Sequence, residues 1–358
     1  MPISSTVDPR RTHPESALAG RARELVRHLQ HQLVKQLEAV ASQYGDEGFS
    51  PVDWLRDEGR HGGGRRYATK ESPVFNRASI NISTVHYDDL RDKRLRSATA
   101  LSTIIHPDNP HAPSMHMHIS WTDLRDETSY WRLMADLNPS LPNREHQQRF
   151  DALLQQTTGE HYEAGKAQGE RYFFIPALER HRGVSHFYLE GYRSDDFDAD
   201  IELARRFGTA VTDGYTEILE QALSSNPSPT DEDYARQLAY HTVYFFQVLT
   251  LDRGTTSGLL VHDQNDIGIL ASLPSAVDRE LLDSWREKVP VPQGELVRNL
   301  VATLPDEDPC PVTDAVRKEL ANQVREHYQS HPEALQLQAS GDVIPPTVKN
   351  HHSDPNGG

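Results

Sequence analysis

The sequence predicts an α+β fold with one largely antiparallel sheet. Three segments in the first half of the chain are rich in β-branched residues or alternate between apolar and polar residues, which is typical of strands. They are residues 78–87, 100–106 and 114–121. Segments with apolar residues at helical spacing precede and follow them. Strands and helices that are grouped in this way favour an α+β domain over an alternating parallel fold.

The other elements follow from the same two periodicities. Residues 16–44 have apolar side chains at helical spacing and Ser16 is a suitable N-cap, so we expect an amphipathic helix there. Further helices are expected at 143–168, 196–223, 231–239, 277–287, 293–303 and 313–328. Further strands are expected at 183–192 and 241–252, with a meander over 257–274. The glycine-rich residues 59–66 are expected to form a flexible loop.

Length and composition predict a single domain in a cytoplasmic protein. The 358 residues are expected to form one domain over 16–334, with residues 1–15 and 335–358 disordered. Cys310 is the only cysteine, which excludes an internal disulfide and a metal site made of cysteines alone. The N-terminus has no apolar run, and no stretch approaches the roughly 18 apolar residues of a membrane span.

The net charge of −16 disfavours nucleic acid as a partner, because such binding needs a basic surface. Two local stretches are basic, residues 59–70 and 91–96. They form either a solvated surface or the mouth of a site for an anionic small molecule. The sequence contains neither a P-loop nor a GxGxxG motif, so two common nucleotide-binding signatures are missing.

Residues 106–118, HPDNPHAPSMHMH, contain four histidines. The prolines predict a constrained loop, and the alternation after them places His116 and His118 on one face of a strand. If this strand pairs with the preceding one, His106 comes close to the same face. Three such imidazoles are suited to a transition metal, and histidine is also a proton shuttle near neutral pH. Spacing alone favours a polar strand face with hydrogen-bonded histidines over a metal site.

Residues 249–260, LTLDRGTTSGLL, place Asp252 and Arg253 at the end of an apolar segment. In one interpretation Asp252 caps a turn and Arg253 is solvated. In the other, Asp252 is a general base and Arg253 binds an anion beside it. Spacing alone leaves both interpretations open.

Six segments resemble, in the same order, the oxygen-dependent coproporphyrinogen III oxidase family, of which this chain looks like a divergent member. They are GGGRR (62–66), SPVFNRASINISTVH (72–86), LSTIIHPDNPHAPSMHMH (101–118), YWRLMADLNP (130–139), RGVSHFYLEG (182–191), and DRGTTSGL (252–259) with ILASLP (269–274). One such motif is weak evidence, but six in order at similar intervals are specific for common ancestry.

The resemblance implies a large, flat antiparallel sheet sandwiched between helices, in a homodimer. It also implies oxidative decarboxylation of two propionates of a porphyrinogen to vinyl groups, a step of haem biosynthesis. O2 is then the co-substrate, and no organic cofactor is needed. In the mechanism that the resemblance implies, a carboxylate removes a pyrrole N–H proton and the electron-rich ring then reacts with O2.

The resemblance also assigns roles to individual residues. The catalytic residues it implies are Asp252 as the base, Arg253 beside it, and His116 as a proton donor. The residues expected to contact the substrate are Ser102, His118, Ser120, Arg182 and Arg65. His106 and His116 match two histidines that would bind a divalent transition metal, if one is used.

The chain departs from the family pattern around the expected pocket. An Asn-x-Arg pair is replaced by His118 and Ser120, and a Gly-Gly-Arg turn is replaced by residues 262–266, so two arginines are lost. A substrate with four carboxylates needs fixed cationic donors. Either other arginines such as Arg66 compensate, or the enzyme oxidises a smaller, non-porphyrin molecule in specialised metabolism. A tetrapyrrole- or metal-binding protein without catalysis is the third hypothesis.

Overall fold

The computed structural model describes residues 8–69, 71–126, 128–226, 228–344 and 346–351. Its centre is a seven-stranded sheet in which every neighbouring pair is antiparallel, as the α+β prediction requires. The strand order is β1 (Ser50–Leu55), β2 (Gly62–Ala68), β3 (Phe75–His86), β4 (Leu95–Pro107), β5 (Ser114–Leu124), β6 (Tyr130–Asn138) and β9 (Val184–Tyr192). Two two-stranded sheets pair β7 (Phe174–Ile175) with β8 (Arg180–His181), and β10 (Ala276–Val277) with β11 (Cys310–Pro311).

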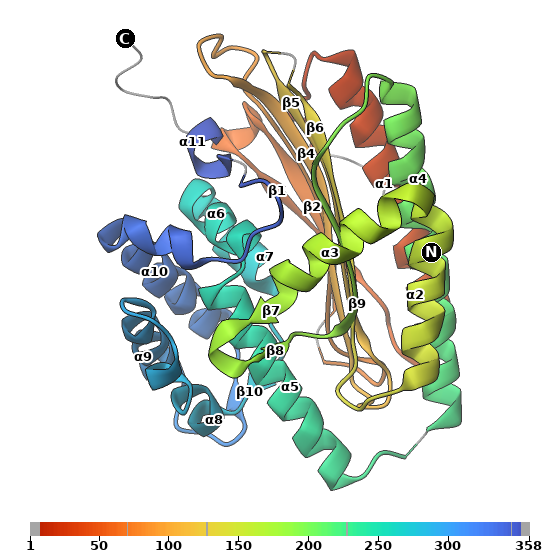
Figure 1. Cartoon of the computed structure of the whole chain (residues 1–358), viewed down its shortest axis with the longest axis vertical. Coiled ribbons are helices and arrows are strands. Elements are labelled where there is room, and N and C mark those ends of the chain that lie inside the picture. The colour runs from red at the N-terminus through yellow and green to blue at the C-terminus, as the bar shows by residue number, and fades with distance from the viewer. Residues whose placement is uncertain (1–7, 70, 127, 227, 345, 352–358) are drawn as a thin grey trace.

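Helices cover both faces of the sheet, so the expected sandwich is confirmed (Figure 1). On one face lie α1 (Ala17–Ser42), α2 (Arg144–Thr158) and α4 (Phe197–Ser225). On the other lie α5 (Asp231–Thr250), α6 (Arg253–Val261), α7 (Asp266–Ile269), α8 (Arg279–Asp283), α9 (Gln293–Thr303) and α10 (Asp314–Ser330). Helix α3 (Tyr162–Phe173) packs along β9, and the short α11 (Thr347–His351) lies close to α6.

The alternation of side chains along the central strands separates a core from a polar face. Met115, Met117 and Ile119 of β5 are buried in the core beneath α1 and α4. His116, His118 and the other even-numbered residues of β5 point to the opposite face, as the sequence predicted. The same rule turns Ser102 of β4 toward this face, directly across from His118.

Two segments have a different structure from the one predicted. Residues 59–66 are not a flexible loop, because Gly62 to Arg66 belong to strand β2. Glycine is needed there because a Cβ on Gly62 would lie 2.2 Å from the carbonyl oxygen of Thr84 on the neighbouring strand. Residues 241–252 are not a strand, because the segment up to Thr250 belongs to helix α5. Every residue from Tyr240 to Thr250 is buried, so hydrophobic periodicity could not distinguish the two structures.

Three further differences concern the type, division and number of elements. The expected meander over 257–274 is helical and contains α6 and α7. The expected helix over 143–168 is two helices, α2 and α3, separated at Gly159, whose φ of 53° is one that glycine adopts readily. Strands β1 and β6 were not predicted, although β6 contains one of the segments that resemble the family.

The two ends of the chain were expected to be disordered. Residues 1–7 and 352–358 lie outside the described residues. Within the described part, Thr12 donates a hydrogen bond to the carbonyl of Gly59 at 2.7 Å, so the segment before α1 is held against the sheet. Near the other end, residues 332–337 form a 3-10 helix and 347–351 form α11, in which His351 is buried.

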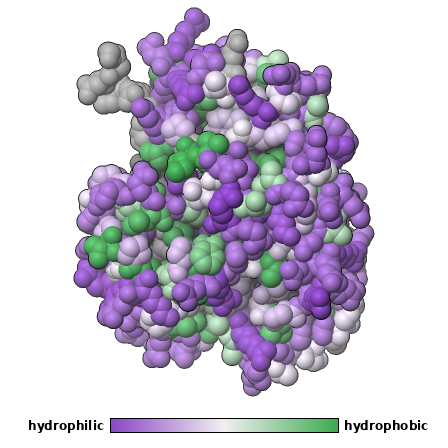
Figure 2. Space-filling view, in the orientation of Figure 1, coloured by the Kyte–Doolittle hydropathy of each residue, from purple (hydrophilic) through white to green (hydrophobic). Residues whose placement is uncertain are grey.

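The described helices include none that is both long and apolar enough to cross a membrane. Hydrophilic side chains cover most of the face seen in Figure 2, and hydrophobic residues form only small patches on it.

Candidate active site

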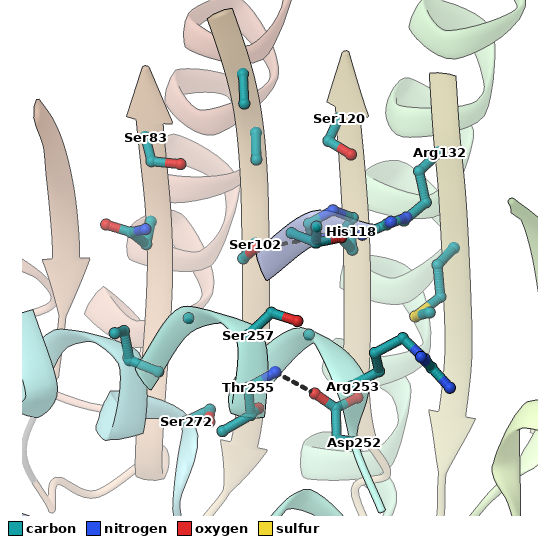
Figure 3. Close-up of a pocket in the computed structure, with 18 of the residues that line it drawn as sticks. Ser83, Ser102, His118, Ser120, Arg132, Asp252, Arg253, Thr255, Ser257 and Ser272 are labelled. Carbon is teal, nitrogen blue, oxygen red and sulfur yellow. Dashed lines mark hydrogen bonds between the residues drawn. The ribbon is translucent and has the colours of Figure 1, made fainter. Parts of the chain in front are cut away.

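A cavity of about 290 Å³ lies between the polar face of the sheet and the helices that cover it. Strands β3 to β6 provide its floor, α5 and α6 provide one wall, and α11 contributes Thr347, Asn350 and His351. Figure 3 shows that the side chains of Ser102, His118, Ser120 and Arg132 come from three adjacent strands. Residues far apart in the sequence therefore meet around one pocket.

The floor of the cavity is built on cross-strand pairs. Ser102 and His118 are directly opposite each other, and the Ser102 Oγ lies 2.8 Å from Nδ1 of His118. Burial and the nearby positive charge of Arg132 hold the pKa of His118 well below its usual value. A neutral imidazole at this position accepts or donates hydrogen bonds but carries no charge at neutral pH. The Nε2 atom of His118 has no partner among the described residues.

Asp252 and Arg253 lie where α5 ends and α6 begins. Asp252 is the N-cap of α6, and its Oδ1 accepts a hydrogen bond of 2.6 Å from the backbone N–H of Thr255 (Figure 3). Its Oδ2 accepts a second hydrogen bond, of 2.9 Å, from the Tyr172 hydroxyl. The two bonds fix the orientation of the carboxylate at the cavity wall. Asp252 thus caps a helix and not the turn between two strands that the sequence suggested, and it also lines the cavity.

His116 belongs to a buried network with Asp136 and Arg182. Its Nδ1 lies 2.8 Å from one Asp136 oxygen, and Arg182 donates to the other oxygen at 2.7 Å. Arg182 also donates to Gln247 at 2.8 Å. The adjacent charge of Arg182 holds the pKa of Asp136 far below its usual range, despite complete burial. An ionised Asp136 orients the His116 ring and leaves Nε2 for a ligand.

An ion pair between Arg132 and Glu190 closes the β6–β9 end of the cavity. Nη2 of Arg132 lies 3.2 Å from a Glu190 oxygen, and the Glu190 side chain is almost completely buried. Arg132 is directly paired with Ser120 across β5 and β6. The arginine that the family pattern expects at position 120 is therefore missing, but an arginine stands on the adjacent strand at the same level.

Seven of the nine residues proposed from the sequence line this cavity. They are Ser102, His116, His118, Ser120, Arg182, Asp252 and Arg253. Arg182 lies at the cavity, but its guanidinium donates hydrogen bonds to Asp136 and Gln247. Its main role is therefore to hold Asp136, which orients His116, and not to bind a substrate.

Arg65 does not lie at the cavity. It pairs with Ile82 across β2 and β3, and Ile82 belongs to the core on the opposite face of the sheet. Its side chain there forms an ion pair of 2.7 Å with Asp53. The sequence could not settle this, because neighbouring residues of a strand point to opposite faces and residues 59–66 were not recognised as a strand.

His106 also lies outside the cavity, in a buried position beside the rings of Tyr244 and His241. Its Nδ1 is 2.8 Å from Ser114 Oγ and its Nε2 is 3.2 Å from the carbonyl of Ser272, so both ring nitrogens are engaged. The described residues contain no group of three or more histidine, cysteine or acidic side chains arranged to hold a metal. The hypothesis that His106 and His116 share a metal ion does not fit this arrangement.

Three further residues of the site were not predicted from the sequence. Tyr172 gives no local signal, because only the packing of α3 brings it to Asp252. For Arg132 and Asp136 the sequence does contain a signal, which is the alternation of side chains along residues 130–138. Their strand alternates, so recognising 130–138 as a strand next to β5 would have placed both on the face of His116 and His118.

Comparison with known proteins agrees with this arrangement. The family model described as coproporphyrinogen III oxidase matches residues 21–290, three quarters of the chain. The chain belongs to the coproporphyrinogen III oxidase family. The resemblance seen in the six sequence segments is thereby confirmed.

The matching relatives are distant. The oxygen-dependent coproporphyrinogen-III oxidase of Rickettsia akari is 26% identical over 70% of this chain and 94% of its own length. The enzyme of Prochlorococcus marinus is 28% identical over 71% of this chain and 81% of its own. The mitochondrial enzyme of Rattus norvegicus is 28% identical over 69% of this chain, which spans only 60% of the rat protein. At this level of identity the pocket of a family member can differ from that of its relatives.

Proposed function

We propose that this family member catalyses an oxygen-dependent oxidative decarboxylation that converts propionate groups of a porphyrinogen to vinyl groups, as in haem biosynthesis. The observation that carries the proposal is the position of Asp252 in its DRGT segment. Its carboxylate lies at the cavity wall, with both oxygens held by hydrogen bonds from Thr255 and Tyr172. A carboxylate with a fixed orientation is suited to removing a proton from a bound ring N–H.

In this proposal the other residues bind the substrate and move a second proton. Arg253 lies beside Asp252 and offers a guanidinium to a substrate carboxylate. His116, whose ring Asp136 orients, moves this proton through its Nε2 atom. Ser102, His118 and Ser120 supply hydrogen-bonding groups from the floor of the cavity. O2 is the oxidant, no organic cofactor takes part, and the protein acts as a cytoplasmic homodimer.

One observation favours a second candidate function, the oxidation of a smaller and less anionic molecule. The cavity of about 290 Å³ is at the lower limit for drug-sized ligands, roughly 300–1,000 Å³, and a tetrapyrrole is larger than most of these. Two acidic residues, Asp252 and Glu190, line it together with three arginines, and Arg132 and Arg182 are already paired. A ligand with four carboxylates would need further cationic partners.

The test is turnover of coproporphyrinogen III by the purified protein in air, followed by the fluorescence of the oxidised vinyl product. The proposal predicts product with the wild type, no product under anaerobic conditions, and a loss of about 10²–10⁴-fold in kcat with Asp252→Asn. Asparagine retains an oxygen that can cap α6, so this variant is expected to fold.

The outcomes separate the hypotheses. Tight tetrapyrrole binding without turnover would favour a binding protein. If the protein neither binds nor converts coproporphyrinogen III, a porphyrinogen substrate is excluded and the smaller molecule remains. The homodimer is tested separately by light scattering, where the mass of a monomer would contradict it.

A further inference from the structure

Three arginines meet between the sheet and helix α10, beside the cavity but outside its lining. Arg66 comes from β2, Arg77 from β3 and Arg317 from α10, one turn after its N-cap Thr313. Arg66 pairs with Asn81 across β2 and β3, so it points to the face covered by α5 to α10. None of the three lines the cavity described above.

Two of these guanidinium groups are buried. Arg66 is 8% exposed and Arg317 is 4% exposed, whereas Arg77 is half-buried. Arg66 is packed tightly against α7, because a Cβ on Gly268 would lie 2.3 Å from its Nη1 atom. Burying a charged group is unfavourable unless a partner compensates for the water that it loses.

The three arginines are short of such partners. Within the described residues, the guanidinium groups of Arg66 and Arg77 make no hydrogen bond or ion pair, and the Nε of each is buried without a partner. Arg317 pairs with Asp314 at 2.6 Å, but that carboxylate is 70% exposed, and Nε and Nη2 of Arg317 remain unsatisfied. By contrast, the buried Arg182 has both Asp136 and Gln247.

The charges also repel one another. Burial lowers the pKa of Arg317 to about 10, and the positive charges of Arg77 and Arg66 contribute to this shift. The position of Arg317 near the N-terminus of α10 adds a further unfavourable interaction, because that end of a helix attracts negative charge. Asp314 acts on all three arginines and offsets part of this positive charge, but burial still lowers the pKa of each of them.

We propose that Arg66, Arg77 and Arg317 form a binding site for a small oxyanion, a phosphate or a carboxylate, next to the N-terminus of α10. Guanidinium groups bind both kinds of oxyanion through paired N–H donors. Arg77 is half-buried and Asp314 is exposed, so the cluster reaches solvent on this side. Binding satisfies the orphan donors and removes the mutual repulsion. The site is independent of the reaction proposed for the cavity.

The test compares thermal unfolding and calorimetric titration with sodium phosphate against sodium chloride at equal ionic strength. Phosphate is expected to raise the Tm of the full-length wild type by several degrees more than chloride, because a ligand of the folded state stabilises it. The double variant Arg77→Gln with Arg317→Gln is expected to lose this difference. Arg298→Gln, an exposed arginine paired with Glu295 on α9, is the matched control and is expected to keep it.

Titration with sodium succinate distinguishes the two chemical classes, since a response to phosphate alone assigns the site to phosphates. If the double variant does not fold, Arg77→Gln alone is used, and phosphate affinity is expected to fall at least tenfold. The proposal is overturned if phosphate stabilises the wild type no more than chloride does. It is also overturned if the double variant keeps the full phosphate effect, because the response then comes from another surface.

Discussion

The Tyr172 hydroxyl donates a hydrogen bond of 2.9 Å to Oδ2 of Asp252, and thereby links α3 to the start of α6. Burial and the adjacent Asp252 charge hold the pKa of Tyr172 well above its usual value, so the phenol remains a donor at neutral and moderately alkaline pH. The carboxylate proposed as the base therefore depends on a residue 80 positions away for its orientation.

Tyr172→Phe is expected to lower kcat about 10–100-fold with little change in KM. A hydrogen bond to a charged group is worth about 1.5–3 kcal/mol, and this one orients the base. Steady-state kinetics with the active substrate provide the measurement. An unchanged kcat would show that Thr255 alone positions Asp252. Tyr234→Phe, at an exposed position on α5, controls for removal of a hydroxyl group.

Arg132 is expected to be a substrate-binding residue that replaces the arginine missing at position 120. Arg132→Ser is predicted to raise KM about tenfold or more and to lower stability by about 3–5 kcal/mol, because Glu190 is left buried without a partner. Adding Ser120→Arg to this variant restores the cation from the directly opposite position and is expected to recover part of both losses.

Steady-state kinetics and urea unfolding measure the two effects separately. If Arg132→Ser loses stability but keeps its KM, Arg132 is only the partner of Glu190. Recovery of KM by the double variant would instead show that the site needs a cation at this level of the sheet, whichever strand supplies it.

The pH dependence of stability is expected to reflect Asp136. Its pKa is depressed in the folded state, so it contributes stability above its unfolded value of about 3.9, and this contribution is lost as the pH falls below that value. Asp136→Asn is therefore expected to be several kcal/mol less stable than the wild type at pH 7, with a smaller difference near pH 3.

Urea unfolding across this pH range is the measurement. Glu232→Gln removes an exposed partner of Arg236 on α5 and is expected to change stability by less than about 1 kcal/mol throughout. A constant difference between the wild type and Asp136→Asn would mean that Asp136 is not ionised in the folded protein.

Helix α11 is expected to limit the size of the ligand. Asn350 and His351 line the cavity, and His351 is fixed there by a hydrogen bond of 2.9 Å to the Tyr87 hydroxyl and by Lys93, which donates to its carbonyl. A chain that ends at Ile344 lacks this wall. Because α11 no longer narrows the cavity, the truncated chain is expected to bind porphyrins several-fold more tightly than the full chain. Fluorescence titration measures the two affinities. Equal affinity would show that the tail moves aside at no cost.

The sequence predicted much of the sheet, because its central strands carry their own signal. The alternation of 114–121 determined which face His116 and His118 occupy, and the structure agrees. Helix α1 and its N-cap Ser16 were predicted for the same local reason. Helix α5 was mistaken for a strand, because a segment buried on all sides has lost the periodicity that identifies a helix.

The motifs of the sequence alone determined the family and the residues around which the site is built, because ancestry preserves short segments such as 101–118 and 252–259. Only the tertiary structure decided which side chains meet. It brought Tyr172 to Asp252, placed Arg132 opposite Ser120, and turned Arg65 away while leaving Arg66 beneath α7. The physical reason is that strand register and helix packing set these contacts, and both depend on residues distant in the chain.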